Sequence, residues 1–348
     1  MGRNQIGKSL VYDTINLLRF PMVVLVVFIH TCGCFSSDDY SYISYYLIRA
    51  IFSNLMEVAV PVFFVISGFL FYRRLENWKW EGYICKLRRR IHSLLIPYLI
   101  WNTCYILFAL LGTIFAVLIK GISFSVLTDW YHSEGFYALY WGGPYLFPFW
   151  YIRDLMVLVV ISPVIYGCVK YASLFFIVVL GVVCFFLNTL PSSTFFFSLG
   201  AYSCLAERYR FLSYKWFRLL IIICYILLLL IRVSSSMKVI ESIEMVDILV
   251  VPVGVVAIFC IGYKLLEIRW IRPNKLLSES SFFIFAFHAF LITDCSRLIG
   301  NLVGADSQIK LIIDFFFLPF IIVFFCILIY LVLRKVFPST MLILTGGR

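Results

Sequence analysis

The sequence predicts an all-α, polytopic integral membrane protein with about ten transmembrane helices and both termini in the cytoplasm. Three observations predict this fold class: the hydropathy of the whole chain, the length of its apolar runs and the positions of its basic residues. The chain of 348 residues is 63% hydrophobic and only 14% charged, and its mean hydropathy is +1.00. Soluble domains are about 25% charged and about 45–50% apolar, so a soluble fold of this length is excluded.

Apolar runs long enough to cross a bilayer follow one another along the whole chain. A helix needs about 20 apolar residues to cross the hydrocarbon core. The run at 194–206 is the weakest because it is short and contains Gly200. The spans and their short loops use up the chain, so residues 1–348 are expected to form one transmembrane domain with no appended soluble domain. We expect spans near residues 15–35, 46–72, 93–119, 148–169, 172–190, 194–206, 216–233, 245–264, 280–299 and 309–333.

The distribution of lysine and arginine predicts the orientation. Cytoplasmic segments of membrane proteins are enriched in these residues. If the N-terminus is inside and the spans alternate, roughly 70% of the 29 lysine and arginine residues fall in inner segments. Arg3 and Lys8 precede the first apolar run as they would in a signal peptide. That run is too long and has no small-residue cleavage site, so we expect a retained helix.

Net charge and cysteine usage exclude two further classes. The formal net charge is +11, but the basic residues lie in short segments between apolar runs. This pattern indicates topology and contact with the lipid bilayer, and we expect no nucleic-acid partner. The 11 cysteines contain no C-x-x-C pair and lie mostly inside apolar runs, where they are typical of small core residues. We therefore expect no metal site and no redox role.

Two ionisable residues share the first span. Arg19 and His30 are separated by about three helical turns plus about 20°, so both point the same way about 16.5 Å apart along the axis. Arg19 is near the cytoplasmic end and His30 lies in the outer half. Ionisable groups within a span are costly and mark functional sites. One interpretation is a polar stripe that lines a cavity; the other is an arginine that reaches the inner interface and a histidine that bonds locally.

Polar residues also lie at the outer ends of the second and fourth spans. Trp150, Tyr151, Arg153 and the adjacent Asp154 open the fourth span, where Arg153 is expected to approach His30 or to form an interface ion pair. Aromatic residues between 121 and 147 are typical of interface anchors, and they also stack on sugar rings. Glu57 precedes Pro61 in the second span, where a carboxylate needs a partner. His30 and Arg153 are expected at a suitable depth. Glu57 could form a structural ion pair or take a catalytic role.

Two further features belong to the inner half. His288 is expected in the inner half to middle of the ninth span, either in a structural hydrogen bond or in a substrate site. Arg88, Arg89 and Arg90 form a basic run before the third span. Such a run is typical of topology and anionic-lipid contact, and arginine also binds the phosphates of a nucleotide-bearing donor.

The chain resembles the membrane-bound acyltransferase family three over essentially its whole length. Each segment is weak alone, but five in order at fitting intervals make the resemblance strong. They are Arg19 to His30 in the first span, Val60 to Leu70 in the second, the basic run with Leu95 to Asn102, Phe149 to Leu155 opening the fourth, and Ser281 to His288 in the ninth.

The resemblance implies ten helices and transfer of an acyl group, often acetyl, from coenzyme A to a carbohydrate hydroxyl. Family members act on O-antigen, exopolysaccharide and other envelope glycans, which implies a multi-pass protein of the bacterial inner membrane. The family's essential histidine and its arginine partner correspond to His30 and Arg19, and its basic motif to Arg90. The chain departs from the family where many members have a second arginine, because Ser93 occupies that position.

The resemblance and the polar residues together predict a mechanism. Acyl-coenzyme A, as co-substrate and not as a bound cofactor, is expected to meet Arg88, Arg89 and Arg90 from the cytoplasm. His30 then acts as general base on the acceptor hydroxyl, or as an acyl-imidazole relay. Arg153 would stabilise the oxyanion, Glu57 is a further catalytic candidate, and Trp150, Tyr151 and His288 are assigned to substrate binding. The alternative is a transporter or flippase, against which the absence of internal repeats argues.

Overall fold

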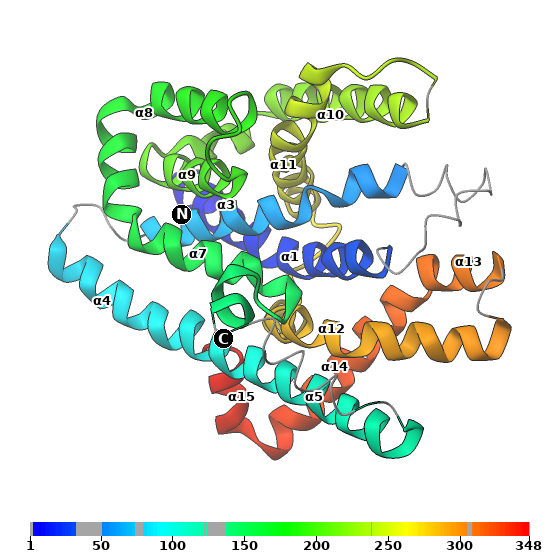
Figure 1. Ribbon diagram of the computed structural model, residues 1–348. Helices are drawn as coiled ribbons and strands as arrows, with labels where there is room; N and C mark the ends of the chain where they lie inside the picture. The colour runs from blue at the N-terminus through cyan, green and yellow to red at the C-terminus, as the bar shows by residue number, and fades with distance from the viewer. Residues whose placement is uncertain are drawn as a thin grey trace.

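The computed structural model describes residues 3–32, 51–73, 79–121, 123, 135, 137–237, 239–304 and 308–347. These residues form helices and contain no strand (Figure 1). The α-helices are α1 (Arg3–Cys32), α3 (Ala59–Tyr72), α4 (Trp80–Arg90), α5 (Ile96–Lys120), α7 (Trp150–Val160), α8 (Ser162–Phe185), α9 (Ser192–Leu205), α10 (Lys215–Ser236), α11 (Glu244–Glu267), α12 (Lys275–Val303), α13 (Gln308–Phe316), α14 (Leu318–Val336) and α15 (Pro338–Leu344). Short π-helices η2 (Ile91–Leu95) and η3 (Ala138–Gly142) and 3₁₀-helices η4 (Phe147–Phe149) and η5 (Arg208–Ser213) join them.

Eight helical segments within the described residues are long and apolar enough to cross a bilayer. The predicted polytopic membrane protein is therefore confirmed. The spans are Ser9–Thr31, Ile51–Tyr72, Trp80–Ile119, Ser162–Phe185, Lys215–Ser236, Glu244–Glu267, Lys275–Val303 and Leu318–Val336. Two helices that were expected to contribute further spans, α7 and α9, have only 11 and 14 residues. At 1.5 Å per residue neither crosses a hydrocarbon core of about 30 Å alone.

The predicted fourth and tenth spans are interrupted. α7 ends at Val160, and α8 begins at Ser162 with Pro163 in its first turn, a position that tolerates proline. α8 then bends at Ser173, whose φ is 45°, so the predicted boundary near residue 170 falls at this bend. The tenth span divides at Phe317 into α13 and α14. Breaks of this kind depend on neighbouring helices that satisfy the freed backbone groups, which hydropathy does not report.

The first helix lies at the centre of the helical assembly. α1 contacts α3, α11, α12 and α14, and Figure 1 shows it running between them. Its residues Val23, Val26 and Val27 are at most 1% exposed, as expected for a helix that is covered on several sides. Neighbouring helices rather than lipid therefore cover much of α1.

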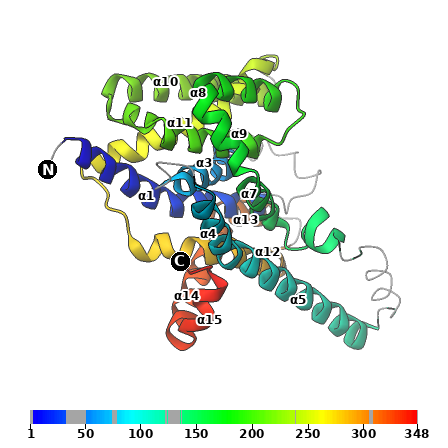
Figure 2. The same cartoon turned by 90° about the vertical axis from the view of Figure 1, so that its left-hand side faces the viewer.

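The closest helix crossing joins α3 to α9. A Cβ atom added at Gly68 would overlap the carbonyl oxygen of Phe197, and one added at Gly200 would overlap that of Val65. Small residues at such a crossing let two backbones approach closely in a membrane. The short helix α9 is therefore fixed to α3, which contributes residues to the cavity described below. Figure 2, turned by 90°, shows α9 beside α3 and beneath α8.

The C-terminal segment covers the π-helix that follows Arg90. The indole Nε1 of Trp101 donates to the carbonyl of Leu344 at 3.0 Å. Gly346 has a φ of 67°, and a Cβ atom at this position would overlap the carbonyl oxygen of Ser93 in η2. The last described residues thus press directly on the backbone that begins one residue after Arg90.

Candidate active site

Two arginines from different helices line one small cavity among the membrane-spanning helices. Arg19 of α1 and Arg90 of α4 share a cavity of about 130 Å³ with Tyr151 of α7. The other lining residues are Phe63, Ile66, Ser67, Leu70, Ser278, Ser281, Phe282 and Phe285. No aspartate or glutamate is among the described residues that line this cavity. Two guanidinium groups without a carboxylate in the same cavity form a site that favours an anion.

The three arginines of the basic run diverge. Successive helical residues are about 100° apart, so neighbours on α4 cannot all point the same way. Arg90 turns inward to the cavity, whereas Arg88 and Arg89 are exposed and line a surface depression with Trp80 and His92. The structure therefore brings only Arg90 of the predicted cluster together with Arg19.

Tyr151 is held in the cavity by α3. Its hydroxyl lies 3.0 Å from the Oγ of Ser67 and donates to the carbonyl of Phe63 at 3.4 Å. Trp150, the preceding residue, instead turns outward, is 39% exposed and packs near Phe64 with ring centroids 6.3 Å apart. The two residues that were assigned together to substrate binding therefore face different environments.

The two histidines of the membrane interior stack on each other. The ring centroids of His30 and His288 are 5.3 Å apart with an interplanar angle of 26°. The rings of His30 and Phe147 are arranged edge to face, with their centroids 4.6 Å apart. His288 is fully buried, its Nδ1 lies 3.0 Å from the carbonyl oxygen of Ile284, and its Nε2 has no hydrogen-bond partner among the described residues. The Nδ1 proton therefore points at the backbone, and the lone pair of Nε2 remains available.

The depth predicted for His288 relative to His30 was wrong. His288 was expected further inward, yet its ring lies beside His30, which is two residues from the end of α1. α12 begins at Lys275, before the predicted start at 280, so residue 288 lies about 20 Å along that helix. The helix simply carries this residue further outward than the predicted span allowed.

Two parallel helices connect the arginine cavity with the histidine pair. Arg19 and Ser281 line the cavity, and His30 and His288 stack further along the same two helices. The separations along the helix axes are about 16.5 Å on α1 and about 10.5 Å on α12. Phe285 lies between the two groups: it lines the cavity, and its ring is 6.3 Å from that of His288. The polar stripe predicted on the first helix therefore has a counterpart on α12.

The family follows from a comparison with protein-family models. The model described as an acyltransferase domain matches residues 12–340, nearly the whole chain. The chain belongs to the acyltransferase 3 family. It is thus a membrane protein whose acyltransferase domain extends over nearly the whole chain.

A distant curated relative has a biosynthetic role. The acyltransferase is 24% identical over 169 residues to the succinoglycan biosynthesis protein ExoH of Rhizobium meliloti (strain 1021). The matched region covers 43% of this chain and 41% of that protein, so the alignment spans about two fifths of the relative. No solved structure matches the chain.

Arg153 of the acyltransferase forms local contacts, and His30 is not among its hydrogen-bond partners within the described residues. Its guanidinium pairs with Asp154 at 3.0 Å and donates to the carbonyls of Trp141 and Gly142, both at 2.9 Å. Asp154 in turn accepts from the Oγ of Ser193 at 3.3 Å. The expected proximity to His30 is replaced by a network that fixes the segment before α7. The same alternative, a local ion pair, was open from the sequence.

Glu57 also has a different partner from those expected. It lies at a break in the helix before α3 and accepts from Arg232 of α10 at 2.6 Å. Arg232 also pairs with Asp247 of α11 at 3.1 Å. The expectation that His30 or Arg153 would neutralise Glu57 was wrong. The adjacency of α10 to this break is a tertiary feature that the spacing of residues within one helix does not report.

Three serines of the cavity were not assigned a role from the sequence. Ser67 lies in the Val60–Leu70 segment of α3. Ser281 precedes His288 by seven residues, so Ser281 and His288 lie on one face of α12. That spacing was a usable signal for Ser281. Ser278 lies one turn earlier on the same helix and carried no separate signal.

Proposed function

We propose that the acyltransferase moves an acyl group, most simply acetyl, from acyl-coenzyme A to a hydroxyl of a cell-envelope polysaccharide or lipid-linked glycan. The observation that supports this proposal is the alignment of the arginine cavity, whose described lining residues include no carboxylate, with a histidine pair along α1 and α12. One end of this arrangement suits an anionic donor, and the other end suits proton transfer. Residues 1–348 act as one transmembrane unit in this proposal.

The arginine cavity is the proposed binding site for one phosphorylated part of the donor. Arg19 and Arg90 supply charge-assisted hydrogen bonds to phosphate oxygens, and the hydroxyls of Ser67, Ser281 and Tyr151 add neutral donors. A volume of about 130 Å³ is below the usual range of ligand pockets, so the cavity takes only a part of coenzyme A. Arg88 and Arg89, exposed on the other face of α4, lie where the donor first approaches the membrane surface.

The histidine pair is the proposed proton-transfer site. His30 takes the proton of the acceptor hydroxyl as its oxygen attacks the thioester carbonyl; the new C–O bond forms and the C–S bond breaks, releasing the coenzyme A thiolate. The Nε2 of His288 has no hydrogen-bond partner in the described part of the chain, and its ring stacks on that of His30, so His288 shares the proton or orients the His30 ring. An acyl-imidazole on His30 is the alternative route.

The acceptor is proposed to bind on the outer side. Trp141 and Trp150 are 40% and 39% exposed, and exposed aromatic faces stack on sugar rings. Arg153 bonds to the carbonyl of Trp141 and so holds one of these aromatics in place. The relative named for succinoglycan biosynthesis supports a polysaccharide acceptor, and the excess of basic residues in inner segments supports the bacterial inner membrane as the location.

The decisive experiment replaces His30 by alanine at matched expression. Envelope polysaccharide O-acetylation, measured by NMR, should fall by about 10²-fold or more. A loss of only a few fold would remove His30 from the chemistry. Purified protein in detergent should also release free coenzyme A from acetyl-coenzyme A in a His30-dependent way. A transporter or flippase would show no such turnover, so this measurement separates the two functions.

A further inference from the structure

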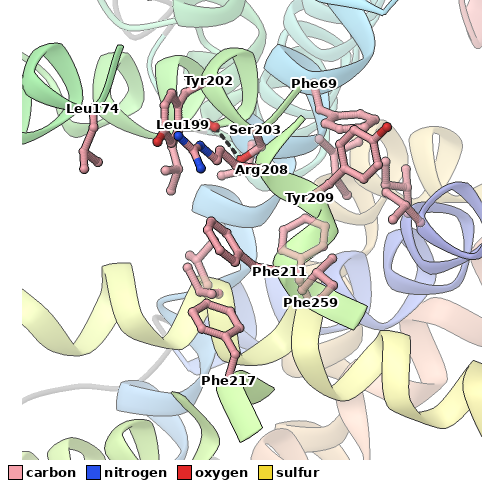
Figure 3. A pocket seen from close by; sticks show the side chains of 17 residues that line it. Phe69, Leu174, Leu199, Tyr202, Ser203, Arg208, Tyr209, Phe211, Phe217 and Phe259 are labelled. Atoms are coloured by element: carbon pink, nitrogen blue, oxygen red, sulfur yellow. Dashed lines mark hydrogen bonds between the residues drawn. The ribbon is translucent and has the colours of Figure 1, made fainter. Parts of the chain in front are cut away.

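A second cavity, separate from the arginine site, is almost entirely apolar. It has a volume of about 400 Å³ and lies between the α3–α9 pair and the α10–α11 pair (Figure 3). We call it the lateral groove. Aliphatic and aromatic side chains make up most of its wall, among them Leu174, Leu199, Phe211, Phe217, Val255 and Phe259.

The lateral groove reaches the outer surface of the helical assembly, because Leu174, which lines it, is 56% exposed and belongs to the apolar span Ser162–Phe185. This side of the groove is expected to face lipid. Its wall also includes Val11 and Ile15 from the first half of α1 and Phe69 near the end of α3, so the groove lies in the half of the membrane nearer the N-terminus. Water in the groove would find few polar partners, and an empty groove would lose dispersion contacts along its whole wall. A hydrocarbon chain needs no polar partner and restores the dispersion contacts.

One cation lies at the end of the groove. Arg208 begins η5, between α9 and α10, and its side chain is exposed and lines the groove. Its guanidinium lies 5.7 Å from the ring centroid of Phe211 and has no carboxylate within ion-pair distance among the described residues. Arg210, two residues later, instead pairs with Glu207. Arg208 is therefore an exposed positive charge in the wall of a mostly apolar groove.

We propose that the lateral groove binds one acyl chain of an anionic glycerophospholipid of the inner leaflet, with the lipid phosphate on Arg208. Basic residues at a membrane surface attract anionic lipid headgroups. The acyl chain of such a lipid would fill the apolar groove while its phosphate lies on the arginine. Ile66 lines both the lateral groove and the arginine cavity. The bound chain would therefore contact a residue of α3 that also lines the cavity of Arg19 and Arg90.

The first test compares two arginines by native mass spectrometry of the purified full chain. Phosphatidylglycerol is titrated against wild type, Arg208→Gln and Arg210→Gln, with phosphatidylethanolamine as the neutral lipid. Wild type and Arg210→Gln should retain phosphatidylglycerol over phosphatidylethanolamine, and Arg208→Gln should bind phosphatidylglycerol about fivefold more weakly. Equal weakening in both variants, or no preference for the anionic lipid in wild type, would overturn the proposal.

The second test fills the groove. Leu199→Trp places an indole in the groove, whereas Leu230→Trp, at a position 58% exposed on α10 and outside the groove, is the matched control. Only the first variant should release the bound lipid. If polyprenyl phosphate displaces phosphatidylglycerol at much lower concentration, the groove belongs to a lipid-linked acceptor and the assignment to a glycerophospholipid fails. All these readouts are binding measurements, so their outcome is independent of the proposed acyl transfer.

Discussion

The imidazole rings of His30 and His288 lie stacked with their centroids 5.3 Å apart and so join α1 to α12. The Nδ1 of His288 is fixed on the carbonyl of Ile284, which leaves its Nε2 as a buried acceptor next to His30. A buried polar atom without a partner is costly unless a substrate or a proton uses it. The arrangement makes His288 the most informative residue to change after His30.

Replacement of His288 by glutamine should lower kcat by about 10²-fold and leave the KM for acyl-coenzyme A within a few fold. The reason is that general acid–base groups contribute about this much to rate, whereas the donor phosphates are expected at the other end of the stripe. Steady-state kinetics with purified protein measure both values. His92→Gln, at an exposed position in η2, is the control and should keep wild-type kcat. A large rise in donor KM with kcat preserved would assign His288 to donor binding instead.

The arginines of α4 should separate into two functional groups. Arg90→Gln and Arg19→Gln should each raise the KM for the donor on the order of tenfold to hundredfold, because each removes a charged hydrogen bond to phosphate. Arg88→Gln and Arg89→Gln should change it by about twofold at most, because surface charges are well screened. Donor titrations at fixed ionic strength make the comparison. Equal increases of the donor KM in Arg88→Gln and Arg90→Gln would show that the donor binds to the exposed face of α4.

Two adjacent glycines provide a matched pair for the contact between the C-terminal segment and η2. Gly346 and Gly347 both have left-handed backbones, with φ of 67° and 76°, so alanine costs about 1–2 kcal/mol of backbone strain at either position. Only at Gly346 does the added Cβ overlap the Ser93 carbonyl; at Gly347 it meets nothing within 4 Å. Gly346→Ala should therefore lower the melting temperature further than Gly347→Ala and raise the donor KM, since η2 follows Arg90 directly.

Thermal unfolding in detergent and donor kinetics on the two glycine variants test this contact. A Trp101→Phe variant, which removes the hydrogen bond to Leu344, should shift donor KM in the same direction as Gly346→Ala. If Gly346→Ala and Gly347→Ala change the melting temperature and the donor KM equally, backbone strain alone explains both effects. The C-terminal segment then does not position Arg90.

Glu57 should behave as a structural residue. Its carboxylate is 43% exposed and pairs with Arg232, which also holds Asp247. Glu57→Gln should leave kcat within about threefold, and the loss of stability should be at most about 1 kcal/mol because exposed pairs are weak. A double-mutant cycle with Arg232→Gln measures the coupling between the two residues. A fall in kcat comparable to that of His288→Gln would restore Glu57 as a catalytic residue.

The sequence by itself determined the membrane class, the helical secondary structure and the orientation of residues along single helices. In lipid every backbone polar group must be satisfied internally, so long apolar runs become helices whatever their neighbours are. The common direction of Arg19 and His30 needs only the helical repeat, and their shared stripe lies on one continuous helix, α1.

Only the tertiary structure decided which helices face each other. In the structure Arg90 lines one cavity with Arg19, whereas Arg88 and Arg89 lie on the exposed face of α4. The ring of His288 stacks on that of His30, and Glu57 pairs with Arg232. These pairings join residues far apart in the sequence, and they depend on close crossings such as the one between α3 and α9. Hydropathy and spacing describe one helix at a time, so the packing between helices had to be observed.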